Sequence, residues 1–208
     1  MKVSNYTKWI TVFIFVFIVN LNTVSGLTFT VDCNGTGDFS TIQEAIDASN
    51  TFDTIIVDPG FYQEHIDYHN KLITIKSLDP NDPNIIDSTI IDGNDTGNVV
   101  VFHNRENEMC VLNGFTIQNG DIGIYCVSNA VDEVQINNCI IQMNDIGVKC
   151  SSGASVKINN AVITENDEEG TYECIGEFTN CIINKNGSTG VLNHSGTLTD
   201  CKITENNN

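Results

Sequence analysis

Five strand-like segments in the second half of the chain share one internal pattern and recur at nearly constant spacing. Each segment has an apolar residue at its first, fourth and sixth positions, and the sixth residue is always isoleucine. These isoleucines are 24, 22, 20 and 20 residues apart, at Ile117, Ile141, Ile163, Ile183 and Ile203. A register repeated in this way is typical of a solenoid, because each short unit can bury its apolar face only against its neighbours.

Each segment is followed by an asparagine and then by a second short strand. The asparagines predicted to form one column are Asn119, Asn144, Asn166, Asn186 and Asn206. Asparagine tolerates left-handed backbone angles and bonds to nearby backbone, so the column indicates a turn repeated in every coil. Strands such as 123–126 and 147–150 then follow, with no room for a helix. We therefore predict an all-β, right-handed parallel β-helix with regular coils over about 110–206.

The first half of the chain shows the same pattern of short strands and turns, but with less regular spacing. Short β-rich runs separated by Pro, Gly, Asn and Asp are found at 54–57, 72–75, 88–91 and 99–102. Before them, about residues 40–49 read as one short helix, with Ser40 as N-cap and Gln43 at the third position. Ile42, Ala45 and Ile46 share a face of this helix. We expect it to cover the open end of the first coil, as the solubility of a solenoid requires.

The N-terminus resembles a secretory signal peptide over residues 1–26. Lys2 and Lys8 precede an eleven-residue apolar run from Trp9 to Val19, and small residues end at Gly26. The alternative, a membrane anchor, needs about twenty apolar residues. Residues 27–208 would then form the β-helix domain, secreted or at the cell surface.

The chain is strongly acidic. Its formal net charge is −18, and removal of Lys2 and Lys8 with the signal peptide takes it to −20. A surface of this sign repels phosphates, which argues against nucleic acid and anionic lipid as partners. Neutral polar ligands and cations remain as partner classes.

All eight cysteines follow the predicted signal peptide, and six of them fit the repeat. Cys139, Cys181 and Cys201 share one inward position, and Cys126, Cys150 and Cys174 are spaced 24 and 24. One interpretation is a buried ladder of thiols, and the other is one or more disulfides, with Cys181 and Cys201 as the pair best placed to bridge. Four Asn-x-Ser/Thr sequons, at Asn34, Asn94, Asn186 and Asn193, are glycan acceptors if the host is a eukaryote.

The stretches 31–48, 54–64, 71–77 and 89–93 resemble the opening of pectin methylesterases and of the wider pectin lyase-like β-helix proteins, a likeness that covers about residues 28–125. The resemblance implies the β-helix fold and, for the esterases, paired catalytic aspartates with a downstream arginine. Here Gln142–Asp145 and Glu165–Asp167 stand where those coils would lie, and the one arginine, Arg105, is upstream. The basic residue of the lyases and the clustered aspartates of the galacturonases are not found either. We therefore assign no catalytic and no cofactor-binding residue.

One acidic constellation follows the repeat. Asp121, Asp145 and Asp167 occupy the turn in three successive coils, so their carboxylates are expected about one coil spacing apart. Oxygen ligands gathered in this way suit Ca²⁺, and the three aspartates are the candidate metal ligands. The alternative is a solvated acidic turn in an acidic protein.

Two further groups of residues offer weaker signals. His65 and His69 flank Asp67, as a metal or acid–base pair would, but without a third ligand or a nucleophile. Tyrosines that offer stacking platforms for sugars are Tyr62, Tyr68, Tyr125 and Tyr172.

Three functions follow. The favoured one is a non-catalytic β-helix that binds extracellular polysaccharide or another surface protein. The second is a carbohydrate-active enzyme, an esterase, lyase or hydrolase. The third is a piece of a longer surface repeat protein, since the pattern continues to Asn206 without a capping element, which also predicts self-association through the last coil.

Overall fold

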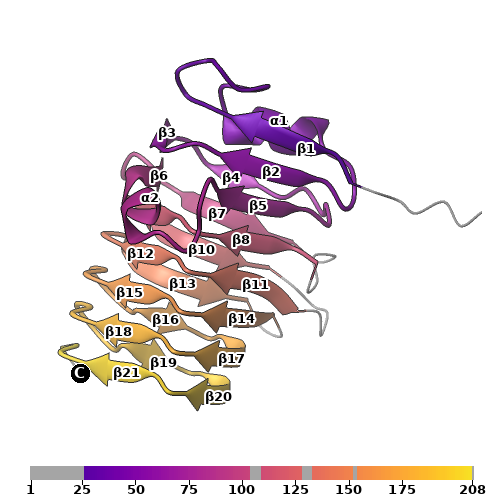
Figure 1. The fold of residues 1–208 in the computed structure, drawn as a ribbon. Helices are drawn as coiled ribbons and strands as arrows, with labels where there is room; N and C mark the ends of the chain where they lie inside the picture. The colour runs from indigo at the N-terminus through magenta and orange to yellow at the C-terminus, as the bar shows by residue number, and fades with distance from the viewer. Residues whose placement is uncertain (1–25, 104–108, 128–132, 152–153, 208) are drawn as a thin grey trace, which may run out of the picture.

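The protein is a right-handed parallel β-helix, as predicted (Figure 1). The computed structural model describes residues 26–103, 109–127, 133–151 and 154–207. The predicted signal peptide therefore lies, but for Gly26, outside the described residues. Strands from successive coils stack into three parallel sheets, which we call sheets 1, 2 and 3.

Every coil contributes its strands in the same order. Sheet 1 consists of β1 (Thr28–Val31), β2 (Thr54–Val57), β5 (Thr74–Ser77), β8 (Val111–Asn113), β11 (Glu133–Asn137), β14 (Ser155–Asn159), β17 (Ile175–Thr179) and β20 (Ser195–Thr199). Sheet 2 consists of β3 (Gly60–Gln63), β6 (Thr89–Asp92), β9 (Thr116–Gln118), β12 (Ile140–Gln142), β15 (Val162–Thr164), β18 (Ile182–Asn184) and β21 (Lys202–Thr204). Sheet 3 consists of β4 (Ile66–Asp67), β7 (Asn98–Phe102), β10 (Ile122–Cys126), β13 (Ile146–Cys150), β16 (Thr171–Tyr172) and β19 (Val191–Leu192).

The isoleucine column of sheet 2 forms the centre of the core in the predicted register. Ile117 pairs with Ile141, Ile141 with Ile163, Ile163 with Ile183 and Ile183 with Ile203. The first four are fully buried, whereas Ile203, in the last described coil, is 41% exposed. Leu198 of the same coil is exposed to the same extent, so this coil presents apolar side chains to solvent.

The asparagine column is real, but its first member was wrongly assigned. Asn144 donates from Nδ2 to Oδ1 of Asn166 at 3.1 Å, and Asn166 and Asn186 each donate in the same way to the asparagine of the following coil at 2.9 Å. In the first of these coils the position belongs to Gly120, whose N–H donates to Asn144 Oδ1. Asn119 lies one residue earlier, at a left-handed turn position with φ of 56°, and its amide donates to Asp92.

The capping helix is shorter than expected and is capped differently. Helix α1 spans Ile42–Ala48, with Thr41 rather than Ser40 as N-cap. The Glu64 carboxylate also accepts hydrogen bonds from the Ile42 and Gln43 N–H groups, at 2.9 and 3.0 Å. The buried face of the helix is as predicted, and Figure 1 shows α1 over the first coil.

A second helix, α2 (Pro83–Ser88), was not predicted. Asp82 is its N-cap and Pro83 its first residue, which is a common way to begin a helix. Thr116 of β9 donates to the carbonyl of Ile86, which ties α2 to sheet 2. No helix among the described residues is long and apolar enough to cross a membrane.

The cysteines are thiols, and six of them are buried. Cys126 pairs in register with Cys150 across β10 and β13. Burial raises the pKa of the Cys139 and Cys181 thiols to about 11, which keeps both protonated at neutral pH. The structure thus favours the buried ladder over the disulfide alternative, with Cys201 partly exposed at the last coil.

Candidate functional site: the outer face of sheet 3 and an acidic hollow

One outward position of sheet 3 forms a column of side chains that crosses six coils. Because the strands are parallel and in register, one residue of each strand stands directly over the next. The paired positions, in order along the column, are Asp67, Val101, Tyr125, Lys149, Tyr172 and Leu192. We call this set the sheet 3 column. At about 4.8 Å per coil it extends for about 24 Å.

An aromatic and cationic segment occupies the middle of this column. The Lys149 ammonium lies over the Tyr172 ring, 5.2 Å from its centroid, an arrangement that places the cation against the negative face of the ring. A hydrogen bond to the Glu173 carboxylate raises the pKa of the Tyr172 hydroxyl. Both tyrosines of the column are partly exposed, so a ligand can reach them.

The other two candidate tyrosines are excluded as ligand contacts. Tyr62 is 2% exposed and its hydroxyl donates to the Asp58 carbonyl at 2.8 Å. Tyr68 is fully buried, stacks on Phe102 with 4.3 Å between ring centroids, and donates to the Val111 carbonyl. Both belong to the core, and sequence alone does not reveal this because a strand position faces in or out according to register.

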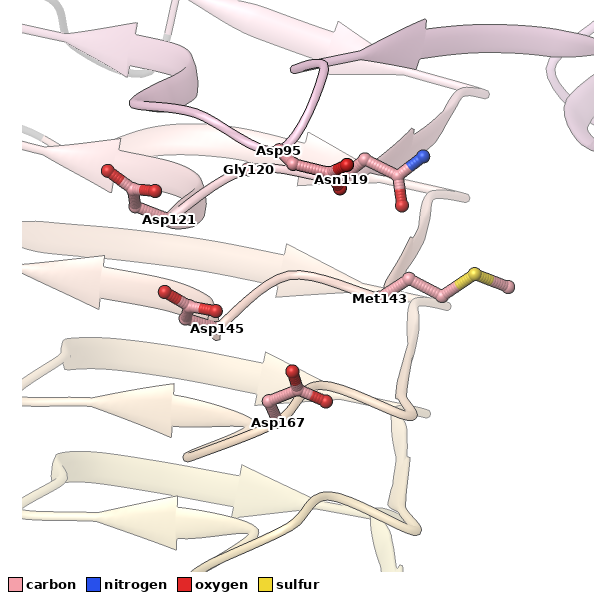
Figure 2. A pocket seen from close by; sticks show the side chains of 7 residues that line it. All are labelled: Asp95, Asn119, Gly120, Asp121, Met143, Asp145 and Asp167. Atoms are coloured by element: carbon pink, nitrogen blue, oxygen red, sulfur yellow. The ribbon is translucent and has the colours of Figure 1, made fainter.

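An acidic hollow of about 130 Å³ lies at the turns that lead into sheet 3. The three predicted aspartates line it on successive coils, one below another in Figure 2, and Asp95 adds a fourth carboxylate. The remaining lining residues are Asn119, Gly120 and Met143. All four carboxylates are exposed to solvent. Asp95 was not predicted, because it belongs to an earlier, irregular coil.

Backbone hydrogen bonds between coils hold the aspartates in place. The Asp145 N–H donates to the Gly120 carbonyl at 3.0 Å, and the Asp167 N–H donates to the Asn144 carbonyl at 2.8 Å. The carboxylates are therefore carried by an ordered turn. Within the described part of the chain, however, no three His, Cys, Asp or Glu side chains converge as ligands of one metal ion. A calcium site here stays a prediction that requires the carboxylates to draw together around the ion.

The histidines divide between two places. His65 Nδ1 lies 2.9 Å from the Asn98 carbonyl oxygen. His69 instead lies between Asp67 and Asp47, with its Nδ1 3.2 Å from an Asp47 carboxylate oxygen. His103 joins Asp67 at 2.9 Å. This last contact was not predicted, because 36 residues separate the two in sequence.

The first tyrosine of the sheet 3 column and the acidic hollow belong to the same strand and the turn before it. Asp121 immediately precedes β10, which carries Tyr125, and Asp145 precedes β13, which carries Lys149. The face therefore combines ring surfaces, one cation and a row of hydrogen-bond acceptors. Arg105, the one arginine, lies outside the described residues.

Solved structures with a similar fold include two pectin methylesterases. A pectin methylesterase from carrot matches with a TM-score of 0.51 and 14% identity, over 86% of this chain and 88% of that one. The chain shares its parallel β-helix fold with this esterase. A deglycosylated pectin methylesterase from Aspergillus niger matches with a TM-score of 0.50 and 16% identity, over 83% of this chain and 86% of that one. No protein-family description and no curated protein matches the sequence.

The likeness confirms the resemblance in fold that the N-terminal half of the sequence indicated. At 14 to 16% identity it carries over the pectin methylesterase fold and no active-site residue. A fold of this kind supports many functions, so the function has to be argued from the side chains of this chain.

Proposed function

We propose that this protein is secreted or displayed at the cell surface and binds an extracellular glycan, without cleaving it, along the outer face of sheet 3. The observation that supports the proposal is the stacked sequence Tyr125, Lys149 and Tyr172 in the sheet 3 column. Two rings that stand two coil spacings apart, about 10 Å, offer successive platforms for the apolar faces of sugar rings.

The acidic hollow suits the hydroxyl groups of such a ligand. Carboxylates only accept hydrogen bonds, and bonds from neutral donors to an ionised acceptor are among the stronger ones. Asp121 and Asp145 lie at the start of the strands that carry the column. Asp121 is about 13 Å from Tyr125 along the strand, so a ligand of two or more sugars that covers Tyr125 can reach these acceptors. A net charge of −18 disfavours polyanions, which points to a neutral or esterified polysaccharide.

The experiment is a binding titration of the full chain against neutral, esterified and de-esterified oligosaccharides, by calorimetry. Tyr125→Ala and Tyr172→Ala should each weaken binding of the neutral ligand by about two- to tenfold, since one aromatic contact contributes roughly 0.5–1.5 kcal/mol. Phe61→Ala is the matched control, because Phe61 is an aromatic residue 55% exposed on sheet 2. Equal affinities for all three variants and the wild type would exclude the sheet 3 face.

A carbohydrate esterase is the second candidate, and the match to two pectin methylesterases over more than four-fifths of this chain favours it. Acid–base work on a glycan requires two groups held at a common site. The aspartates of the hollow form an acidic row beside the sheet 3 column and are the candidate groups for such work. Methanol release from esterified pectin above a heat-killed control, lost in Asp145→Ala, would establish this function in place of simple binding.

A further inference from the structure

The sequon at Asn186 lies inside the fold. The Asn186 side chain is 1% exposed and belongs to the asparagine ladder. Its Nδ2 donates to Asn206 Oδ1 at 2.9 Å and to the Ile163 carbonyl at 3.3 Å, so both amide hydrogens are used within the protein. An N-linked sugar replaces one of these hydrogens. Neither the bond nor the space for a sugar is available in the folded coil.

The other two residues of this sequon also have structural roles. A Cβ on Gly187 would lie 2.0 Å from the Asp167 carbonyl oxygen, so the coils can approach only with glycine here. Ser188 Oγ donates to Glu169 Oε1 at 3.2 Å. The equivalent turns of the neighbouring coils, 144–146 and 166–168, read Asn-Asp-Ile and Asn-Asp-Glu and are not sequons. The Asn-Gly-Ser sequence at 186–188 is thus explained by packing alone.

The asparagines of the other three sequons lie at the surface, unlike Asn186. Asn34, Asn94 and Asn193 are exposed. Asn94 and Asn193 have φ of 55° and 53° and stand at turns. Asn34 Nδ2 uses one hydrogen, on Asp32 Oδ1 at 3.0 Å. Asn94 acts as an acceptor, from Gln63 Nε2. A sugar on any of them extends into solvent and breaks no buried hydrogen bond.

We propose that Asn34, Asn94 and Asn193 are N-glycosylation sites of this protein when it passes through a eukaryotic secretory pathway, and that folded, secreted molecules carry no glycan on Asn186. In the transfer, Nδ2 bonds to the anomeric carbon of a diphosphate-activated oligosaccharide. The bond from that carbon to the diphosphate oxygen breaks, the diphosphate leaves with the electron pair, and a base takes one amide proton. A chain that receives a sugar on Asn186 cannot close the ladder at that coil and stays unfolded inside the cell.

Two of the three sites lie near the sheet 3 face. Asn94 precedes Asp95, which lines the acidic hollow, and Asn193 follows Leu192, the last member of the sheet 3 column. Glycans at these positions would stand at the margins of that face. The inference itself rests on the exposure and hydrogen bonding of the four asparagines and is independent of what the face binds.

The experiment is secretion of the full chain from a eukaryotic cell line, followed by enzymatic removal of N-glycans in H₂¹⁸O and peptide mass spectrometry. Asn34, Asn94 and Asn193 should carry the isotope label, and Asn186 should not. Thr36→Ala, Thr96→Ala and Ser195→Ala remove one sequon each and should each lower the intact mass by one glycan. Labelled Asn186 in folded, secreted protein, or an unlabelled residue among Asn34, Asn94 and Asn193, would overturn the proposal.

A variant pair separates burial from poor recognition of the Asn186 sequon. Asn186→Gln should leave the number of glycans unchanged but lower the melting temperature, because the ladder loses its geometry. Glu168→Thr creates a sequon at the buried Asn166, which should likewise be empty in secreted protein. A glycan on Asn166 in folded protein would show that the ladder does not exclude sugars, and would also overturn the proposal.

Discussion

Asn166 donates a hydrogen bond from its Nδ2 to Oδ1 of Asn186, in the next coil, over 2.9 Å, and both side chains are buried. Asn166 also takes part in bonds to Asn144 and to the Ile141 carbonyl. Its removal therefore leaves several buried polar groups without partners. We expect Asn166→Ala to lower the free energy of unfolding by about 1–3 kcal/mol or more, as measured by urea titration.

The control for this variant is Asn159→Ala. Asn159 also bonds to an asparagine of the previous coil, donating to Asn137 Oδ1 at 2.8 Å, but it lies on the outer side of sheet 1 where water can replace the lost bond. Asn159→Ala should lower the free energy of unfolding by well under half as much as Asn166→Ala does. Equal costs would show that burial of the ladder is not what makes it stabilising.

The isoleucine column provides a sharper test of register. Ile163 is fully buried, so Ile163→Asp places a charge without a partner in the core and should cost on the order of 3–5 kcal/mol. Val162→Asp is the matched control one residue away, on the outer side of β15. Circular dichroism on urea titration measures both. A larger loss for the Val162 variant would contradict the register.

The acidic hollow predicts a response to calcium. If Asp121, Asp145 and Asp167 close around Ca²⁺, millimolar calcium stabilises the folded state by mass action and raises the melting temperature. Asp145→Asn should remove this gain, whereas Asp200→Asn, an exposed aspartate at another turn, should keep it. If calcium leaves the wild-type melting temperature unchanged, the three aspartates form a solvated acidic turn and not a calcium site.

Cleavage of the predicted signal peptide after Gly26 has a structural consequence. The Leu27 N–H donates to Asp53 Oδ1 at 2.7 Å, and Asp53 is only 4% exposed. Cleavage there turns this N–H into an ammonium group and the contact into a partly buried ion pair, since Leu27 itself is exposed. We expect intact mass spectrometry of secreted protein to give Leu27 as the first residue. Blocking that amine by acetylation should lower the melting temperature, and in Asp53→Asn it should have little further effect.

The repetitive half of the fold could be predicted because its signals are periodic. Ile141, Ile163 and Ile183 repeat at coil length and face the core, so spacing alone gives sheet 2 and its register. The same coil-length repeat also predicted the acidic turn that carries Asp121, Asp145 and Asp167. Asn119 was assigned to the wrong position because two adjacent turn positions both favour asparagine. The first position, that of Asn119, requires a left-handed backbone angle. The second, that of Gly120, is the one whose asparagines hydrogen-bond from coil to coil.

The proposed binding face was harder to predict. Tyr62 and Tyr125 look alike in sequence, yet Tyr62 is in the core and Tyr125 is on the surface. Tyr62 belongs to an early coil without a clear repeat, so its register could not be read from the sequence. Lys149 could not be recognised as part of this face from the sequence, because it contacts the Tyr172 ring of the next coil. His103 meets Asp67 through the stacking of β4 on β7, which brings together segments that no local motif connects.

The equal length of the last coils determines which insertions and deletions the fold can accept during evolution. β14, β17 and β20 pair with Ser155 opposite Ile175 and Ile175 opposite Ser195, so the coil that begins at Ile175 is 20 residues long, and its ends meet neighbours of the same shape. A recombination that deletes residues 175–194 joins Cys174 to Ser195 and leaves the isoleucine and asparagine columns in step. A duplication of the same segment does so as well. Related genes are therefore expected to differ in length by whole coils, in steps of about twenty codons, more readily than by single residues within a coil.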